Sequence, residues 1–429
     1  MTVRPVDLSV VIPAEEDGEN LATLLSQVHS ALRDLSVDYE IILVDRQANP
    51  LPPQLTRQDQ TRLFESSGPG YGAALVTGLQ QAAGEYVITM DPDLAHPASF
   101  LRDLWTVRNT ADVVVASRYV SGGHANMPFF RILLSRLLNL VFSRGLDLHL
   151  RDMSSGFRLY KTHIVQGLEA QSRDYDVLQE FLVQILMAGY RIREIPFTYN
   201  SRSKKTPYKR LLGFGLAYLK TFARLWGQRN SIASADYDTR AYDALMPPQR
   251  YWQRQRYKHI TRLLAGKGRC LDVGCGSSRI IQALPPGSIA LDILMRKLRF
   301  ARRYGRQTIQ GSIFALPLIS ASFPCLICSQ VIEHVPRARA LDELDRVLQP
   351  GGFLILGTPD YSKWQWRVIE RLYKILLPQA YADEHITHYT RRELLEEFVH
   401  RRNYTLEAVR YILQGEIILG LRKPPAPSK

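Results

Sequence analysis

The chain has 429 residues, of which 45% are hydrophobic and 22% are charged, and its formal net charge is +14. This length allows two domains, and the composition excludes a largely disordered chain. No apolar run approaches the roughly 20 residues that span a bilayer, and no secretion signal opens the sequence. We therefore expect a cytoplasmic protein without a transmembrane segment, peripheral on the cytoplasmic face of the membrane if it meets one.

The charge is unevenly distributed along the chain. Residues 1–100 contain 5 Lys and Arg against 14 Asp and Glu, whereas residues 201–300 contain 20 against 5. A basic middle segment indicates an anionic partner, either membrane phosphate or nucleic acid, or else a solvated basic surface.

The first 120 residues alternate strand and helix patterns. Runs rich in Val and Ile predict four strands, at residues 8–12, 40–44, 86–90 and 112–116. Leucines at helical spacing predict a helix over residues 20–35. This alternation is typical of βαβ units around a parallel sheet, so we expect an α/β fold.

Asp91-Pro-Asp93 directly follows the third strand, with His96 and Pro97 just beyond. Open α/β sheets bind ligands at the edge where such strands end. Neighbouring carboxylates repel each other unless a cation lies between them, and a divalent ion bound to a diphosphate is such a cation. A polar turn after a strand has the same pattern. The glycine-rich turn at 68–74 could bind phosphate through its amides or serve chain geometry alone.

Further motifs occur in order with this acidic pair: Ser9–Ala14, Val44-Asp45, Gly70–Ala74, Ser117–Tyr119, Arg131–Arg136 and Asp152–Tyr160. Together they resemble family 2 glycosyltransferases of the polyprenyl-phosphate type, the dolichyl-phosphate mannose or glucose synthases, over residues 7–225. The resemblance implies a GT-A fold, a nucleotide-diphosphate sugar donor, and a lipid-phosphate acceptor at the membrane surface. It also implies a Mg²⁺ or Mn²⁺ ion held through Asp91 and Asp93.

The resemblance also implies roles for particular residues. Donor contacts fall on Pro13, Asp17, Asp45 and Asp91. Catalytic roles fall on Asp93, Arg118 and Arg131. Contacts with the acceptor phosphate fall on Arg118, Arg131, Ser135, Arg136 and Arg158. A lipid monophosphate is already largely anionic near neutral pH, its second pKa being about 6, so the site needs positioned cations more than a strong base. Guanidinium groups match phosphate oxygens in paired hydrogen bonds.

Residues 131–142 support the phosphate contacts. On a helical wheel Arg131, Ser135, Arg136 and Asn139 share one polar arc, and the leucines face away from it. An ordinary surface helix with two exposed arginines would show the same pattern.

Two positions depart from the family pattern. The family usually has Pro-x-Tyr-Asn-Glu after the first strand, where this chain has Pro13-Ala-Glu15-Glu16-Asp17. It usually has two acids after the second strand, where Asp45 is followed here by Arg46. In the family these positions contact the nucleoside. The departures therefore predict either an altered nucleotide-sugar donor or a weakened nucleotide site.

Residues 209–226 form a cationic amphipathic pattern, with one apolar side and Lys209, Arg210, Lys220 and Arg224 on the opposite arc. Such a helix can lie in a membrane interface or pack its apolar side onto the sheet. We assign residues 1–228 to the glycosyltransferase domain, 229–250 to a linker or entry segment, and 251–429 to a second domain.

The second domain begins with a strand that runs into a glycine turn, Asp272-Val-Gly274-Cys-Gly276, and Asp292 ends the next strand. The later motifs are residues 310–317, 322–335 and 348–356. Together they resemble class I S-adenosylmethionine-dependent methyltransferases with a Rossmann-like fold, over residues 250–420. The resemblance places the turn against the methionine part, Asp292 on the ribose, Ser312 near adenine, and Gln330 in the loop over the cofactor. Relatives commonly have Asp at position 312.

A methyl acceptor needs a positioned nucleophile and often a base. The candidate groups are Glu333, His334, His385 and His388, of which we assign Glu333 and His385 to catalysis. His385 and His388 could equally be a metal pair or surface residues.

The four cysteines, at positions 270, 275, 325 and 328, all lie in this half. Cys325 and Cys328 have the spacing of a metal or redox pair, but they lie in an apolar run with no second pair. We predict reduced core cysteines.

The sequence thus predicts a bifunctional transferase that moves a sugar to a polyprenyl phosphate and methylates a glycan or lipid acceptor. One alternative is an active methyltransferase that carries a non-catalytic, glycosyltransferase-like module for binding lipid or glycan. Another is an RNA methyltransferase with a basic RNA-binding middle. Because no RNA-binding motif occurs, we expect no nucleic-acid partner.

Overall fold

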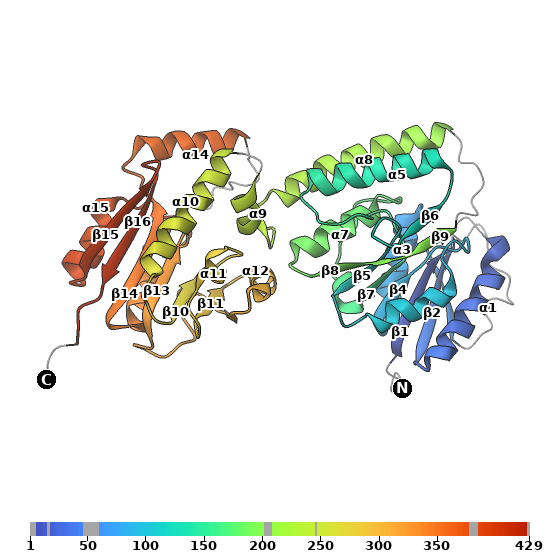
Figure 1. The fold of residues 1–429 in the computed structure, drawn as a ribbon, viewed down its shortest axis with the longest axis horizontal. Coiled ribbons are helices and arrows are strands. Elements are labelled where there is room, and N and C mark those ends of the chain that lie inside the picture. The colour runs from blue at the N-terminus through green and yellow to red at the C-terminus, as the bar shows by residue number, and fades with distance from the viewer. Residues whose placement is uncertain are drawn as a thin grey trace. The chain divides into compact units, whose positions relative to one another are not determined.

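The computed structural model describes residues 6–14, 18–45, 60–200, 208–244, 247–376 and 385–426. The chain divides into two compact units (Figure 1). The first unit comprises residues 1–186 and 190–226, and the second comprises 187–189 and 227–429. The domain boundary predicted at residue 228 lies close to this division.

The first unit is built on a seven-stranded sheet of order β3-β2-β1-β4-β7-β5-β8. The strands are β1 (Val6–Pro13), β2 (Tyr39–Asp45), β3 (Thr61–Glu65), β4 (Gly84–Thr89), β5 (Val113–Ser117), β7 (Arg158–Lys161) and β8 (Ile192–Pro196). The four predicted strands are confirmed as β1, β2, β4 and β5. These four strands run in one direction, as predicted, and β7, from a later part of the chain, runs antiparallel between β4 and β5.

The antiparallel strand β7 brings its preceding loop to the edge where β4 ends. Arg158 pairs with both Thr89 of β4 and Val115 of β5. The Thr89 hydroxyl donates to the carbonyl of Gly156 at 2.6 Å. The loop before β7 therefore lies beside the acidic pair that follows β4.

Helices cover this sheet and complete the unit: α1 (Gly18–Leu35), α3 (Tyr71–Gln81), α4 (Leu101–Thr106), α5 (Phe129–Gly145), α6 (Thr162–Val165), α7 (Val177–Met187) and α8 (Tyr208–Arg229). The short helix η1 (Ala98–Phe100) precedes α4, and β6 (His124–Asn126) pairs with β9 (Thr198–Asn200). The predicted helix at 20–35 is confirmed as α1, whose leucines are buried in the core of the unit.

Helix α5 buries Asn139 of its polar arc and exposes several of its leucines, whereas Arg136 of the same arc is exposed. Asn139 is 3% exposed, whereas Leu133, Leu137 and Leu140 are 51–53% exposed. This orientation is the reverse of an ordinary surface helix. Arg136 is exposed and Arg131 is partly buried, so the alternative of arginines exposed to solvent stays open.

Helix α8 runs alongside α5 in the first unit (Figure 1). Phe142 of α5 meets the rings of Tyr218 and Phe222 at centroid distances of 6.2 and 5.3 Å. Leu219 of α8, however, is 65% exposed. The apolar side of α8 thus packs in part against α5 and stays in part exposed, and its position in a membrane interface stays a prediction.

The second unit is built on a seven-stranded sheet of order β12-β11-β10-β13-β14-β16-β15, in which β16 runs antiparallel to β14 and β15. The strands are β10 (Cys270–Val273), β11 (Ile289–Asp292), β12 (Gln307–Gln310), β13 (Phe323–Ser329), β14 (Leu348–Pro359), β15 (Thr405–Ile412) and β16 (Glu416–Arg422). The predicted reduced core cysteines are confirmed, since all four are free and buried.

The helices of this unit are α9 (Tyr237–Asp243), α10 (Pro247–Leu264), α11 (Ile280–Ala283), α12 (Met295–Ala301), α13 (Arg337–Val347), α14 (Trp364–Leu376) and α15 (Arg391–Leu395). Short helices are η2 (Arg302–Tyr304), η3 (Ile332–His334) and η4 (Glu396–Arg401). Helix α9 and the start of α10 lie in the segment that we assigned to a linker, so most of that segment is folded. Within the described residues, no helix has the length and apolar character to cross a membrane.

Candidate active sites

Asp91 lies at the carboxyl edge of the first sheet with one carboxylate oxygen held in place. Tyr71 donates its hydroxyl hydrogen to Asp91 Oδ1 at 3.1 Å, and the Tyr71 ring stacks on Tyr175. The Asp91 side chain is 24% exposed. Burial raises the pKa of Asp91 to about 6, although Tyr71, Arg118 and Arg158 lower it. A carboxylate in this position gains from a nearby cation.

His96 contacts the backbone of Asp91 as a neutral ring. It accepts a hydrogen bond from the Asp91 backbone amide through Nδ1 at 2.9 Å, so its proton lies on Nε2. Burial lowers the pKa of His96 to about 4. The 3.7 Å approach of Nε2 to Asp91 Oδ2 is therefore not an ion pair at neutral pH. Phe157 stacks on the ring at 4.7 Å and fixes its plane.

The glycine-rich turn before α3 serves chain geometry. A Cβ atom on Gly70 would lie 2.3 Å from the carbonyl oxygen of Arg173, and one on Gly72 would lie 2.8 Å from the Arg173 carbonyl carbon. The Gly72 amide donates to the same carbonyl oxygen at 2.9 Å. The two alternatives for this turn were phosphate binding and chain geometry. These close contacts support chain geometry.

Arg118 makes a paired ion contact at the same edge. Its Nε and Nη2 donate to the two carboxylate oxygens of Asp152, both at 2.7 Å, and Nη2 also donates to Ser154. Asp152 is fully buried, and its backbone amide donates to Glu194. The positive charge of Arg118 is thus already balanced by the Asp152 carboxylate. Its attraction for a phosphate is therefore weaker than we expected from the sequence.

Arg158 is fully buried, contrary to a phosphate-binding role. Its Nε, Nη1 and Nη2 donate to the backbone carbonyls of Ser155, Leu178 and Met153 at 2.7–2.8 Å. The prediction of direct phosphate contact is wrong for this arginine. It fixes the loop before β7, since a guanidinium has enough donors to satisfy several carbonyls at once.

The polar arc of α5 reaches the same loop. Ser135 and Asn139 both lie within hydrogen-bonding distance of the Ser154 hydroxyl, at 3.3 Å. The Arg136 guanidinium lies 5.5 Å from the ring of Tyr119. Arg131 is partly buried on the same helix. The Ser154 hydroxyl therefore links Arg118 to Ser135 and Asn139, and contact of this group with an acceptor phosphate stays a prediction.

The remaining residues that we predicted at the sugar-donor site lie at or just after the ends of their strands. Pro13 ends β1 and Asp45 ends β2, and both are buried. Asp93, on the loop after β4, accepts a hydrogen bond from the Ala95 amide at 3.0 Å and is partly exposed. Asp17, Glu15, Glu16 and Arg46 lie outside the described residues.

The second unit contains a cavity of about 470 Å³ at the carboxyl ends of β10, β11 and β13. The predicted cofactor residues that line it are Asp272, Gly274, Gly276, Asp292, Ser312 and Gln330. Gly274 has a φ of +70°, and a Cβ there would lie 2.3 Å from Val331. The turn therefore requires glycine on both counts.

Two acids on adjacent strands flank this glycine turn. Asp292 accepts hydrogen bonds from the amides of Gly276 and Leu294, both at 2.8 Å. Burial raises the pKa of Asp292 above its ordinary value. Burial, and then the neighbouring Asp292, raise the pKa of Asp272 to about 7.

A third acid, Asp238 of α9, was missed by the sequence analysis. Its Oδ2 accepts from the Ser277 amide at 2.9 Å and from Lys297 Nζ at 2.9 Å. Although burial alone raises the pKa of Asp238, Lys297 and Ser277 lower it to about 2. Asp238 and Lys297 both line the cavity. Neither lies in a motif, so only the fold brings them to the glycine turn.

Gln330 contains a buried side-chain amide nitrogen that makes no hydrogen bond among the described residues. Its φ is +60°, and its backbone amide donates to Gly357 at 2.8 Å. Its Nε2 is buried and has no hydrogen-bond partner in the described part of the chain. Because Gln330 lines the cavity, that donor is available to a polar ligand such as a nucleoside.

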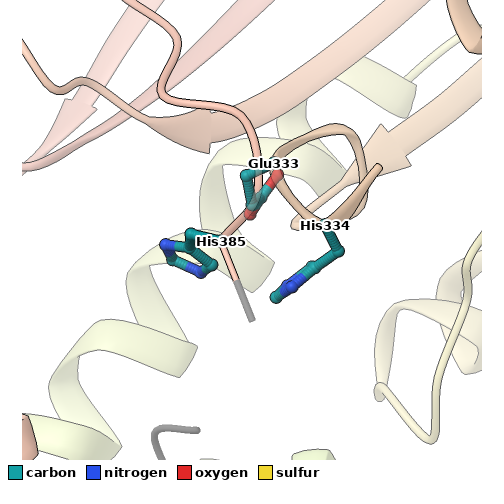
Figure 2. A group of neighbouring side chains, drawn as sticks. All are labelled: Glu333, His334 and His385. Carbon is teal, nitrogen blue, oxygen red and sulfur yellow. The ribbon is translucent and has the colours of Figure 1, made fainter. Parts of the chain in front are cut away.

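The predicted acceptor-side residues also come together. Glu333 and His334 form part of η3, and His385 lies near them, with single ligand atoms of the three within 4.8 Å of one another (Figure 2). Burial raises the pKa of Glu333 to about 8. His388 instead stacks on Tyr361 at 4.0 Å and is not part of this group of three.

Comparison with known families gives one match in each unit. Residues 9–168 match the family described as glycosyl transferase family 2, and residues 271–356 match the family described as a methyltransferase domain. The chain is thus similar to glycosyl transferase family 2 in its first unit and to the methyltransferase domain family in its second. The predicted α/β fold class is confirmed in both units, each of which is built on a mixed seven-stranded sheet.

Two curated relatives match the glycosyltransferase half. A dolichol-phosphate mannosyltransferase of Pyrococcus furiosus is 29% identical over 206 residues, 46% of this chain and 57% of the relative. A polyprenol monophosphomannose synthase of Mycolicibacterium smegmatis is 28% identical over 217 residues, 47% of this chain and 80% of the relative. The chain thus spans little more than half the length of the Pyrococcus protein.

Solved structures resemble each half separately. Glucosyl-3-phosphoglycerate synthase of Mycobacterium tuberculosis with uridine diphosphate has a TM-score of 0.42 at 18% identity, over 52% of this chain and 80% of its own. A methyltransferase of Thermotoga maritima, described as a possible histamine N-methyltransferase, has a TM-score of 0.33 at 20% identity, over 41% of this chain and 94% of its own.

Proposed function

We propose that the first domain transfers a sugar from a nucleotide diphosphate to a polyprenyl phosphate, and that the second binds S-adenosylmethionine and methylates a glycan or lipid acceptor. The observation that carries the first activity is the pair Asp91 and Asp93 at the carboxyl edge of the sheet. Asp91 is partly exposed and carries a pKa raised by burial, so a divalent ion fits beside it. Asp91 and Asp93 would hold Mg²⁺ or Mn²⁺, which supplies charge compensation for the diphosphate.

The acceptor side of this site is formed by α5 and the loop before β7. Arg131 and Arg136 are the cations proposed to contact the acceptor phosphate, while Arg118 and Ser135 shape the surface around them. Because the phosphate is itself anionic, the protein's task is to orient it and offset its charge. Arg158 positions the loop from within.

The exposed apolar side of α5 supports a peripheral position at the membrane surface. Phe129 and Phe130 are 78% and 54% exposed, and the exposed leucines of the same helix continue that surface. An apolar helix face beside basic residues can enter the boundary between head groups and acyl chains. A lipid acceptor would reach the site from that side.

In the second domain, Asp292 would bind the ribose hydroxyls of S-adenosylmethionine, and Gln330 and Ser312 would face other polar parts of it. The cofactor supplies the methyl group. Glu333 and His385 lie on the acceptor side, where a group that positions or deprotonates the nucleophile is needed.

The test is a transfer assay with a panel of nucleotide sugars, a short polyprenyl phosphate and Mn²⁺. One donor should give a lipid-linked sugar, and Asp91→Asn should reduce its formation by about 100-fold or more, because the metal's contribution is worth several kcal/mol. Asp103→Asn, an exposed acid on α4, is the matched control and should retain activity. Donor binding without turnover, unchanged in Asp91→Asn, would favour the non-catalytic binding module instead.

A further inference from the structure

The acceptor side of the methyltransferase domain has the ligand set of a metal site. Glu333 offers a carboxylate oxygen, and His334 and His385 each offer an imidazole nitrogen, all within 4.8 Å of one another. Figure 2 shows the three side chains converging on one small volume. Two imidazoles and one carboxylate are a ligand set used by catalytic zinc and by non-haem iron.

Glu333 supplies an independent observation. Its side chain is fully buried, and Oε2 accepts a hydrogen bond from the Thr358 hydroxyl at 3.0 Å. Its Oε1 is buried and has no hydrogen-bond partner among the residues that the structure describes. A buried carboxylate oxygen without a hydrogen bond raises the free energy of the folded state unless a cation or a hydrogen-bond donor binds it.

The two segments that supply the ligands are tied together by the backbone. The carbonyl of Glu333 accepts hydrogen bonds from the amides of Ile386 and Thr387 at 2.8 and 2.9 Å. The Thr387 hydroxyl donates to the carbonyl of Val335 at 2.7 Å. His385 is therefore held next to η3 by contacts that do not involve its own ring.

The ring of His385 is oriented by neighbours as metal-bound histidines are. Its Nδ1 lies 2.6 Å from the Tyr361 hydroxyl, and its ring stacks on Trp366. When Nδ1 carries the proton and donates it to Tyr361, the lone pair on Nε2 points away from Tyr361 and can bind a metal.

We propose that Glu333, His334 and His385 bind one divalent transition-metal ion, of the class of Zn²⁺, Fe²⁺ or Co²⁺, at the wall of the cofactor cavity. Ligand atoms at about 2.1 Å from a tetrahedral ion lie about 3.4 Å apart, so the three side chains close slightly around it. Three protein ligands leave coordination positions open. Since His334 also lines the cavity, these positions are available to an oxygen of the methyl acceptor.

This role for the ion as an acceptor-binding centre rests on the proposed methyltransferase function, whereas metal binding itself does not. The experiment is calorimetric titration of the full chain with Zn²⁺, and with Mg²⁺ for comparison, in an Asp91→Asn/Asp93→Asn background that removes the proposed metal ligands of the first domain. Binding of S-adenosylmethionine is measured in parallel on the same protein.

We expect one Zn²⁺ per chain, with Mg²⁺ bound at least about 100-fold more weakly, since imidazole ligands suit Zn²⁺ and not Mg²⁺. His334→Ala and His385→Ala should each lower the Zn²⁺ affinity at least about tenfold, and Tyr361→Phe by about tenfold through the His385 ring. His400→Ala, an exposed histidine of η4, should leave it unchanged.

An unchanged Zn²⁺ affinity in the His334→Ala and His385→Ala variants, with S-adenosylmethionine still bound, would overturn the metal site alone. Tight Zn²⁺ binding without any binding of S-adenosylmethionine would keep the metal site and overturn the methyltransferase function. Since His334 and His385 are partly exposed, these variants avoid the folding risk of changing the buried Glu333.

Discussion

At the residue scale, the acidic loop after β4 depends on side chains that do not themselves bind a ligand. Asp91 is held by Tyr71 through its side chain and by His96 through its backbone. Gly156 allows this packing, since a Cβ there would lie 2.8 Å from the Tyr71 hydroxyl and 3.0 Å from Asp91 Oδ1. The loop before β7 thus helps to set the position of the acid.

The buried His96 predicts a dependence of stability on pH. Its pKa is about 4 in the fold and about 6.5 when unfolded, so the unfolded chain binds a proton first as the pH falls. The contribution of the neutral His96 to the free energy of unfolding is fully present above pH 6.5. It is lost between about pH 6.5 and 4, by about 3 kcal/mol in total. Chemical denaturation in EDTA across this range, compared with His96→Asn, measures the difference. Equal pH slopes for the two proteins would contradict it.

The buried Arg158 predicts a large loss of stability on substitution. Arg158→Met leaves three backbone carbonyls without their donor and should lower the free energy of unfolding of the first domain by about 3 kcal/mol. Denaturant unfolding followed by tyrosine and tryptophan fluorescence measures it. Arg102→Met, an exposed arginine on α4, is the control, with a change expected within about 0.5 kcal/mol. A similarly small change for Arg158→Met would show that the loop holds without it.

At the element scale, the sequence predicts strands and helices where the pattern is local and fails where neighbours decide. The runs of Val and Ile located β1, β2, β4 and β5. No local signal shows that β7 enters antiparallel between β4 and β5, because that pairing joins residues about 70 apart in the chain. The same strand places Arg158 in the core. This arginine, which its motif predicted to contact phosphate, is therefore buried.

Helix α5 is the element whose orientation matters most for function. Its polar arc was visible on a helical wheel, but the wheel alone does not show which arc faces the protein. The structure turns Asn139 inward and leaves Leu133 and Leu137 half exposed. An exposed apolar helix face of this size is uncommon on a protein that stays in water.

We therefore predict that α5 carries binding to lipid surfaces. Replacing Phe129, Leu133 and Leu137 together by Ser should lower binding to vesicles of phosphatidylcholine with phosphatidylglycerol at least about tenfold, because each exposed apolar side chain loses its transfer energy. Vesicle co-sedimentation measures it. Leu63→Ser and Ile319→Ser, exposed apolar residues elsewhere, are the controls. Equal binding by all of these proteins would remove α5 from the membrane contact.

At the scale of the whole molecule, the described residues contain two seven-stranded sheets, each with its own core and its own candidate site at the carboxyl edge of its strands. The sequence motifs predicted the α/β fold of both units and candidate residues that lie at both sheet edges, since glycine turns and strand-end acids are local features. They did not predict Asp238 and Lys297 beside the glycine turn of the second domain. Those contacts depend on α9 folding with a sheet that begins more than 30 residues later.

The central claim is that one chain contains two transferase sites that work through separate residues. The most direct measurement combines sugar transfer to polyprenyl phosphate with calorimetric binding of S-adenosylmethionine in two reciprocal variants. Asp93→Asn should lose sugar transfer by about 100-fold or more and bind S-adenosylmethionine as the wild type does. Asp292→Ala should weaken S-adenosylmethionine binding at least about tenfold and keep sugar transfer, since it removes a charged acceptor for the ribose hydroxyls. Sugar transfer that persists in Asp93→Asn, or cofactor binding that is untouched in Asp292→Ala, would contradict the account.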